Sequence, residues 1–224
     1  MPTDPTLDVE RDLLAGGARW VIGCDEVGRG AIAGPVAVGV CAIDQSHTLV
    51  PAGLRDSKLL SERVRTAMAP AAAQWSHSTA VGLTGADEID RTGIIAALGA
   101  AGVRALATLF ESGVDPRDAV ILLDGTHDWL SPVLRTPLRV VVRAKADRDC
   151  ASVAAASVIA KVHRDTLMIA AHTEHPEYGW ASNKGYGAAA HLDAIDRLGP
   201  ASLHRRSWLR PRLPMPSAEF SVNA

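Results

Sequence analysis

Residues 19–36 have the sequence Arg-Trp-Val-Ile-Gly-Cys-Asp-Glu-Val-Gly-Arg-Gly-Ala-Ile-Ala-Gly-Pro-Val, a strand-like run that stops at two adjacent carboxylates, Asp25 and Glu26. Neighbouring carboxylates repel each other, so a shared proton or a cation is needed to bring them together. The glycines of the Gly28-Arg29-Gly30 turn that follows let the backbone approach a ligand closely. The pattern indicates a metal site beside a phosphate or sugar site. The alternative is a surface hairpin whose Asp-Glu pair is solvated.

The same stretch predicts the first two strands of a sheet. Residues 19–24 form one strand, and residues 35–43 alternate valines with small side chains, as a second strand does. Because the turn between them is tight, we expect the two strands to pair antiparallel. A later run, residues 120–123, is continuously apolar, which is typical of a strand buried on both faces.

Two further carboxylates follow predicted strands. Asp124 comes directly after the 120–123 run, and Asp147 follows a strand expected at 138–143. Open α/β sheets bind ligands at the ends of their strands, and neighbouring strands are only about 5 Å apart. Acids from several strand ends can therefore meet in one cluster. Each acid also has a simpler interpretation, because Asp124 can be a turn residue before glycine and Asp147 can cap the next helix.

The remaining elements are expected from hydrophobic periodicity and from capping and turn residues. Helices are expected at 61–68, 86–91, 94–111, 150–171 and 188–198, a further strand at 76–83 and a loop at 126–137. The polar segment 172–192 combines aromatic residues, glycines and a lysine, as nucleic-acid-binding faces do. The most basic stretch, residues 204–212, is either a solvated tail or an arm that contacts a nucleic-acid backbone.

Composition predicts a single domain with one large core. The chain has 224 residues, of which 47% are hydrophobic. The formal net charge of -2 does not indicate nucleic-acid binding, although a local basic groove can serve where the total charge is near zero. The three cysteines are widely spaced without a CxxC pattern, which indicates reduced thiols in a cytoplasmic protein. We expect the acidic N-terminus not to be a signal peptide, and we expect no run of about 18 apolar residues and hence no membrane span.

Several blocks of the sequence, in order over roughly residues 20 to 210, resemble the type 2 ribonucleases H, the ribonuclease HII family. These blocks are Asp25-Glu26-Val27-Gly28-Arg29-Gly30, Ala33-Gly34-Pro35-Val36, Asp56-Ser57-Lys58, Leu123-Asp124-Gly125, Lys145-Ala146-Asp147, residues 154–161, and Asn183-Lys184-Gly185-Tyr186-Gly187. One block alone would be weak evidence, but their order is specific. The resemblance implies an α/β fold, a ribonuclease H-like mixed β-sheet flanked by helices with a C-terminal helical extension.

The resemblance also implies the chemistry of the acids. Position for position, the family's four catalytic and metal-binding acids fall on Asp25, Glu26, Asp124 and Asp147. Their oxygen atoms suit Mg²⁺ or Mn²⁺. Two such ions would support phosphodiester hydrolysis that leaves a 3′-hydroxyl and a 5′-phosphate. Asp149 stands where the family commonly has Lys, and we expect it not to be a ligand.

The implied substrates are RNA/DNA hybrids and duplex DNA with a single embedded ribonucleotide, which would be cut on its 5′ side. A ribonucleotide differs by its 2′-hydroxyl, which both donates and accepts hydrogen bonds, and the backbone of Gly28, Arg29 and Gly30 offers both partners. Tyr186 is expected to stack on the next sugar and so to favour deoxyribose there. The residues expected to contact phosphates are Lys58, Lys184 and the Arg205-Arg206 pair.

Two other classes of function stay open from the residues alone. Another nuclease or integrase of the same fold would share the acids but not the Gly-Arg-Gly turn and Tyr186. A non-catalytic nucleic-acid-binding module would keep a basic face without four converging acids. We expect a monomer, with a tail and lead-in at 1–18 that is frayed over residues 1–12, a catalytic domain at 19–210 and a disordered tail at 211–224.

Overall fold

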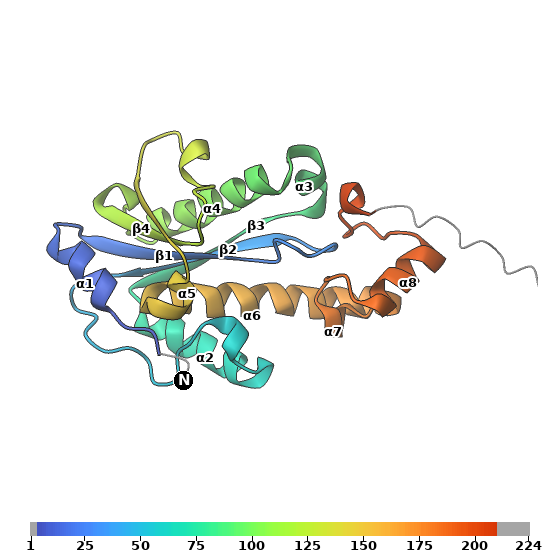
Figure 1. The fold of residues 1–224 in the computed structure, drawn as a ribbon, viewed down its shortest axis with the longest axis horizontal. Coiled ribbons are helices and arrows are strands. Elements are labelled where there is room, and N and C mark those ends of the chain that lie inside the picture. Colours follow the sequence, from blue (N-terminus) through green and yellow to red (C-terminus); the bar gives the residue numbers. More distant parts are fainter. Residues whose placement is uncertain (1–3, 210–224) are drawn as a thin grey trace, which may run out of the picture.

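A five-stranded sheet forms the centre of the molecule in a computed structural model that describes residues 4–209 (Figure 1). Its strands are β1 (Trp20–Val27), β2 (Val36–Ile43), β3 (Ser78–Thr84), β4 (Ala119–Asp124) and β5 (Arg139–Arg143). Their order across the sheet is β3-β2-β1-β4-β5. The expected disordered tail at 211–224 lies outside the described residues.

The sheet is mixed, and its polarity places the acids. β1 pairs antiparallel with β2, as the tight turn predicted, and β2 pairs antiparallel with β3. β4 and β5 run parallel to β1, with Cys24 opposite Leu123. Parallel strands end at the same edge of a sheet, so the residues that follow Cys24 and Leu123 come out side by side.

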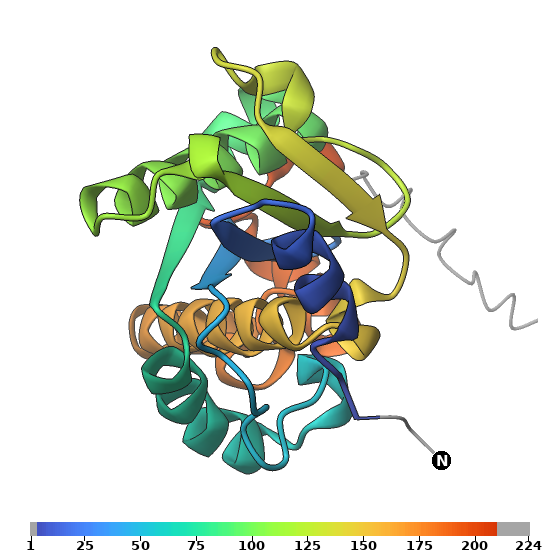
Figure 2. The ribbon, with the colours of Figure 1, turned by 90° about the vertical axis from the view of Figure 1, so that its left-hand side faces the viewer.

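Helices cover both faces of the sheet (Figure 1), and the two layers are also seen from the end that α1 occupies (Figure 2). The helices are α1 (Asp8–Ala15), α2 (Glu62–Trp75), α3 (Ala86–Thr92), α4 (Ile94–Glu111), α5 (Ala146–Asp149), α6 (Ala151–Glu174), α7 (Trp180–Asn183) and α8 (Ala189–Leu198). α4 packs with Ile22 and Ile121 of one face, whereas Val21 and Leu122 point to the α6 layer. This alternation is the side-chain period of a strand.

Close packing of α6 on the sheet depends on two glycines. A Cβ atom on Gly23 would lie 2.3 Å from the carbonyl carbon of Ser152, and one on Gly39 would lie 2.4 Å from the carbonyl oxygen of Ala156. The alanine-rich stretch of α6 therefore lies directly against the backbone of β1 and β2. The position of α6 is consequently fixed with little freedom, and the side chains that it directs at the end of β1 are fixed with it.

A smaller cluster forms the C-terminal helical extension. Met168 near the end of α6 packs with Tyr178, Trp180 and Ala194, which belong to the segment carrying α7 and α8. Ala33, from the turn between β1 and β2, is buried in the same cluster. The extension is thereby attached to the turn that the sequence singled out.

The expected fraying of the N-terminal part is wrong, whereas α4 occupies the residues expected for it. Residues 8–15 form α1, which buries Leu14 and also Glu10, whose carboxylate accepts hydrogen bonds from the backbone and hydroxyl groups of Ser152. The frayed tail was expected because polar residues dominate this stretch. α4 has a mean hydropathy of 1.6 over 18 residues, enough by length and composition for a membrane span. In the fold it is a core helix packed on β2 and β3.

Two helix boundaries also differ from the expected ones. α2 continues past Met68 to Trp75 with Pro70 inside it, and α6 continues to Glu174. The continuation of α2 packs against the fold, since its Ala72 is buried.

Candidate active site

Four carboxylates meet at one edge of the sheet. Asp25 and Glu26 occupy the end of β1, and Asp124 is the last residue of the adjacent parallel strand β4. Asp147 lies in α5, directly after β5, and its backbone N–H donates a hydrogen bond of 3.2 Å to Oδ1 of Asp124. The Glu26 N–H donates to Oδ1 of Asp25 at 2.9 Å. The structure thus brings together the four acids that the sequence singled out.

Burial and mutual repulsion favour the protonated forms of these acids. Burial raises the pKa of Asp25 well above its usual value, and the charges of Glu26 and Asp124 raise it further, while a hydrogen bond from Ser157 opposes the change. The pKa of Glu26 is raised by burial and by Asp124, against the influence of Arg29. Burial and the charge of Asp147 raise the pKa of Asp124. A bound cation would relieve this repulsion.

Two basic side chains reach into the cluster. Nζ of Lys58 lies 2.9 Å from Oδ2 of Asp147, and Nη1 of Arg29 lies 3.6 Å from Oε1 of Glu26. Burial lowers the pKa of Lys58, but the hydrogen bond to Asp147 and the charge of Asp25 outweigh it and raise the pKa overall. Lys58 is therefore charged and lies at the acids, although its side chain is 68% exposed and remains open to other anions.

The acids do not form a closed ligand shell. Within residues 4–209, no three His, Cys, Asp or Glu side chains are close enough to hold an ion between them. Asp147 instead has Lys58 as its partner. The donor set nevertheless fits a hard divalent cation, because it consists of carboxylate oxygens that repel one another, and Mg²⁺ commonly uses only one or two carboxylates beside water and phosphate oxygens.

A cleft adjoins the acids on the side of β4. It has a volume of 390 Å³ and is lined by Glu26, Arg29 and Asp124 together with residues 125–127, 129 and 144–145. Its lining thus combines two of the acids, Glu26 and Asp124, with two basic residues, Arg29 and Lys145. A cleft with this charge distribution can take a phosphate group near a cation.

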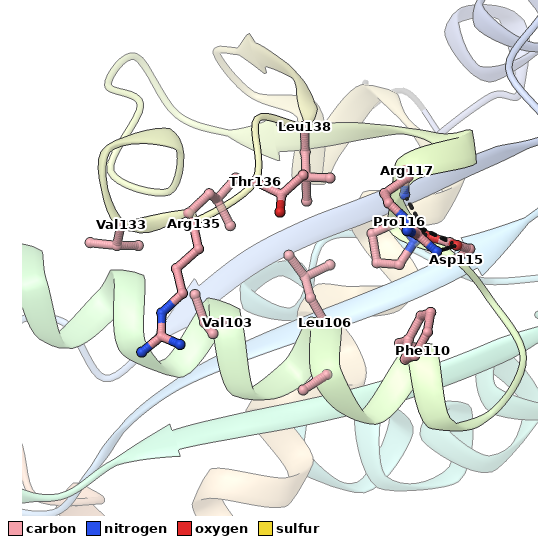
Figure 3. Close-up of a pocket in the computed structure, with 12 residues that line it drawn as sticks. Val103, Leu106, Phe110, Asp115, Pro116, Arg117, Val133, Arg135, Thr136 and Leu138 are labelled. Atoms are coloured by element: carbon pink, nitrogen blue, oxygen red, sulfur yellow. Dashed lines mark hydrogen bonds and ion pairs between the residues drawn. The ribbon is translucent and has the colours of Figure 1, made fainter.

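A second pocket, of 530 Å³, lies between α4 and residues 131–138 and is mainly apolar (Figure 3). Val103, Leu106 and Phe110 line it from α4. Its one carboxylate, Asp115, is ion-paired with Arg117. This pocket has no group of acids, so we place the candidate active site in the cleft beside Asp124.

The Gly28-Arg29-Gly30 turn and Tyr186 belong to one hydrogen-bonded unit. The backbone N–H groups of Ile32 and Ala33 both donate to the carbonyl oxygen of Gly185, at 2.9 and 3.0 Å. Tyr186 is 37% exposed, and the guanidinium of Arg164 lies 5.5 Å from the centre of its ring. The turn next to the acids and the tyrosine are therefore held together, although more than 150 residues separate them in sequence.

The expected phosphate-binding residues have different surroundings. Arg205 is fully buried and donates to the carbonyl oxygens of Gly28, Arg29 and Gly34, so the prediction that it contacts phosphate is wrong. The sequence could not distinguish it from its exposed neighbour Arg206. Burial lowers the pKa of Arg205 to about 10.

The side chain of Lys184 is also largely enclosed. Only 7% of the residue is exposed, and Nζ donates to the carbonyl oxygen of Ala181 and lies 3.3 Å from Oε2 of Glu62. These partners compete with a phosphate for its ammonium group. The role expected for Lys184 stays a prediction.

Asp149 pairs with Arg148 and Arg143, and two other residues near the acid cluster or the turn, Ser157 and Arg164, were not anticipated. Oδ1 of Asp149 lies 2.6 Å from Nε of Arg148, and this hydrogen bond lowers the pKa of Asp149. Ser157 bonds to Ser57 at 2.8 Å and faces Asp25. Ser157 and Arg164 both lie on α6. The only sequence feature that could have indicated them is that each is a polar residue in a helix rich in alanine and other apolar residues.

Comparison with known proteins agrees with this architecture. A family model described as Ribonuclease HII matches residues 22–211. A ribonuclease HII from Streptomyces avermitilis is 45% identical over 210 residues, which cover 93% of this chain and 85% of that protein. The ribonuclease HII of Rhizorhabdus wittichii is 42% identical over 200 residues, 89% of this chain and 90% of that protein.

Solved structures have the same fold. The ribonuclease H2 from Pyrococcus horikoshii OT3 superposes with a TM-score of 0.66 at 26% identity, covering 84% of this chain and 93% of that one. Bst-RNase HIII in complex with Mn²⁺ has a TM-score of 0.64 at 22% identity, covering 87% of this chain and 65% of that one, a likeness that concerns the fold. The predicted ribonuclease H-like mixed sheet with flanking helices is confirmed. The chain belongs to the ribonuclease HII family and is an endonuclease of the ribonuclease H type.

Proposed function

We propose that this protein hydrolyses the RNA strand of RNA/DNA hybrids and cuts duplex DNA on the 5′ side of a single embedded ribonucleotide. The observation that carries the proposal is the position of the Gly28-Arg29-Gly30 turn. It leads directly from the acids at the end of β1 and is hydrogen-bonded to the segment that carries Tyr186. Groups that can recognise a sugar thus lie beside groups that can promote phosphodiester hydrolysis.

We propose that Asp25, Glu26, Asp124 and Asp147 hold Mg²⁺ or Mn²⁺, with two ions present during hydrolysis. Such ions supply an activated water and stabilise the leaving 3′ oxygen. The raised pKa values of Asp25, Glu26 and Asp124 support the proposal, because a cation relieves the repulsion behind them. The Mn²⁺ complex of the ribonuclease HIII with the same fold is in keeping with it.

The protein's own groups bind and orient the substrate. The backbone amide and carbonyl groups of Gly28, Arg29 and Gly30 are assigned to the 2′-hydroxyl. The ring of Tyr186 is assigned to the deoxyribose on the 3′ side, where a 2′-hydroxyl would crowd it. The carbonyl oxygen of Arg29, which already accepts from Arg205, can accept a second hydrogen bond, because a carbonyl oxygen has two lone pairs.

Lys58 is the cation best placed to contact a phosphate next to the acids. It reaches Asp147 and stays 68% exposed, so it can exchange that carboxylate for a phosphate oxygen when ions bind. Lys184 can contact a phosphate in the same way only when its ion pair with Glu62 is broken. We also propose that the protein acts as a monomer. We place it in the cytoplasm, in line with its three free, buried cysteines.

Cleavage of four end-labelled substrates tests the proposal. They are an RNA/DNA hybrid, a DNA duplex with one ribonucleotide, the all-DNA duplex and a single-stranded RNA, each assayed with Mg²⁺, Mn²⁺ or EDTA. Cleavage of the first two with either ion and loss of cleavage in EDTA are expected. Asp124→Asn should lower the rate by orders of magnitude, whereas Asp149→Asn, a neighbouring acid paired with Arg148, should retain activity. Activity of wild type in EDTA, or of Asp124→Asn with either ion, would contradict the assignment.

A further inference from the structure

Arg164 is a buried cation whose partners are backbone carbonyl groups. The residue is 0% exposed, and in the part of the chain that the structure describes no carboxylate oxygen lies within 4 Å of its guanidinium nitrogens. Its Nε donates to the carbonyl oxygen of Pro35 at 2.8 Å, Nη1 to that of Lys184 at 2.9 Å and Nη2 to that of Ala33 at 3.0 Å. Burying an arginine without a counter-charge is costly unless its donors are satisfied. The three carbonyl oxygens must therefore stay in place for Arg164 to remain buried.

These carbonyl groups come from the two segments that the proposed substrate recognition uses. Ala33 and Pro35 end the turn that starts at Gly28, and Lys184 is two residues before Tyr186. The same guanidinium lies 5.5 Å from the ring centre of Tyr186, within cation–π distance. One planar side chain on the rigid helix α6 therefore contacts the turn, the backbone before the tyrosine and the tyrosine ring.

The packing around Arg164 leaves little room for adjustment. A Cβ atom on Gly28 would lie 2.0 Å from Nε of Arg164, and one on Gly185 would lie 2.4 Å from the carbonyl oxygen of Ala33. Gly28 and Gly185 have φ values of 80° and 84°, which glycine adopts without strain. A shift of the guanidinium would consequently move the turn and the tyrosine relative to each other.

We infer that Arg164 is a positioning residue that sets the distance between the 2′-hydroxyl-reading turn and Tyr186, and thereby the preference for a ribonucleotide followed by a deoxyribonucleotide. The inference rests on the proposed function and deepens it. Lysine cannot replace arginine here, because its single ammonium group lacks the planar fork that reaches three carbonyl groups at once. A long hybrid offers a ribonucleotide at every position, so its cleavage depends less on the spacing between turn and tyrosine.

The test compares Arg164→Lys with wild type by kcat/KM on the single-ribonucleotide duplex and on a long hybrid. We expect about a tenfold or larger loss on the former and a loss within about threefold on the latter, since small displacements of a positioning group have large kinetic effects. The ratio of the two losses is the readout, because general damage to the fold lowers both alike. When Tyr186→Ala is already present, adding Arg164→Lys should cause equal losses on the two substrates. This is the non-additive result expected for residues that act through one contact.

Arg104→Lys is the matched control. Arg104 is also an arginine that donates to a backbone carbonyl, that of Leu83, but it lies on α4 across the sheet. Its substitution should leave both substrates unaffected. Arg164→Gln, which keeps two donors, serves as a second variant, and melting curves are recorded for all.

Each result decides between defined alternatives. Equal losses on both substrates, or a ratio that falls further in the Tyr186→Ala background, would overturn the positioning role. Absence of a cooperative melting transition in both Arg164 variants would also overturn it, because the arginine would then be a requirement of folding. If wild type itself fails to cut the single-ribonucleotide duplex, the proposed function fails with it, and that outcome is distinct from the others.

Discussion

Acidification should destabilise the fold through one buried histidine, His204. The indole N–H of Trp180 donates to Nε2 of His191 at 3.0 Å, so that nitrogen is an acceptor. Nε2 of His204 lies 3.0 Å from the same atom and must therefore carry the hydrogen. The Nδ1 of His204 is then unprotonated, buried and without a hydrogen-bond partner in the described part of the chain. Protonation of this atom would give the buried ring a positive charge.

The size of the effect follows from the surroundings of His204. Burial lowers its pKa to about 4, and the neighbouring His191, His175 and Arg206 add to this, with partial compensation from the Ala201 carbonyl. A folded pKa below the ordinary value of 6.5 means that the unfolded chain binds the proton more tightly. Stability is therefore fully present above pH 6.5 and is lost as the pH falls towards 4. The full loss is about 3 kcal/mol, of which about 2 kcal/mol is lost by pH 5.

Urea unfolding followed by circular dichroism, in EDTA at pH 7.5 and pH 5, measures this loss. The carboxylates of the active site have raised pKa values and act with the opposite sign, so the quantity to compare is the difference between wild type and His204→Gln. The variant should lose less stability than wild type on acidification, by about 2 kcal/mol. His163→Gln, on the exposed face of α6, should behave as wild type. Identical losses for wild type and His204→Gln would refute the reasoning.

Three further outcomes are expected. Asp124→Asn should melt slightly above wild type in EDTA, since it removes a repelling charge while its amide oxygen can still accept the N–H of Asp147; a lower melting temperature would contradict this. Lys58→Ala should weaken binding of all duplexes in gel-shift titrations and reduce the slope of log affinity against log salt by about one, and an unchanged slope would exclude the phosphate contact. Gly39→Ala should cost about 1–3 kcal/mol or more in urea unfolding, because the new Cβ would meet backbone of α6, and a change under about 0.5 kcal/mol would count against that packing.

Much of the fold followed from local patterns. The Val-rich runs predicted β1 and β2 and their antiparallel pairing, and the continuous apolar run before Asp124 predicted a strand buried on both faces. These predictions succeeded because burial of a strand determines the order of its side chains: they alternate when one face is buried and are continuously apolar when both faces are. The resemblance then indicated which strand-end acids belong together.

The rest depended on contacts between distant segments. Nothing local marks Glu10 as the partner of Ser152, and this pair anchors α1, which was expected to be frayed. Arg164 and Arg205 belong to a residue type that is mostly exposed, yet both are buried because backbone carbonyl groups of a remote turn satisfy them. The pairing of Lys58 with Asp147 spans 89 residues and likewise appears only once the chain is folded.

Mapping the products of the single-ribonucleotide duplex is the most direct test of the central claim, that the acids cut where the turn and Tyr186 recognise an RNA-to-DNA junction. A wild-type digest with Mn²⁺ or Mg²⁺ is resolved at single-nucleotide resolution, and the ends are probed with phosphatase and ligase. We expect one cut on the 5′ side of the ribonucleotide, with a 3′-hydroxyl and a 5′-phosphate, and we expect Tyr186→Ala to lose more activity here than on a long hybrid. A cut on the 3′ side, a 2′,3′-cyclic phosphate end or equal losses on both substrates would contradict the account.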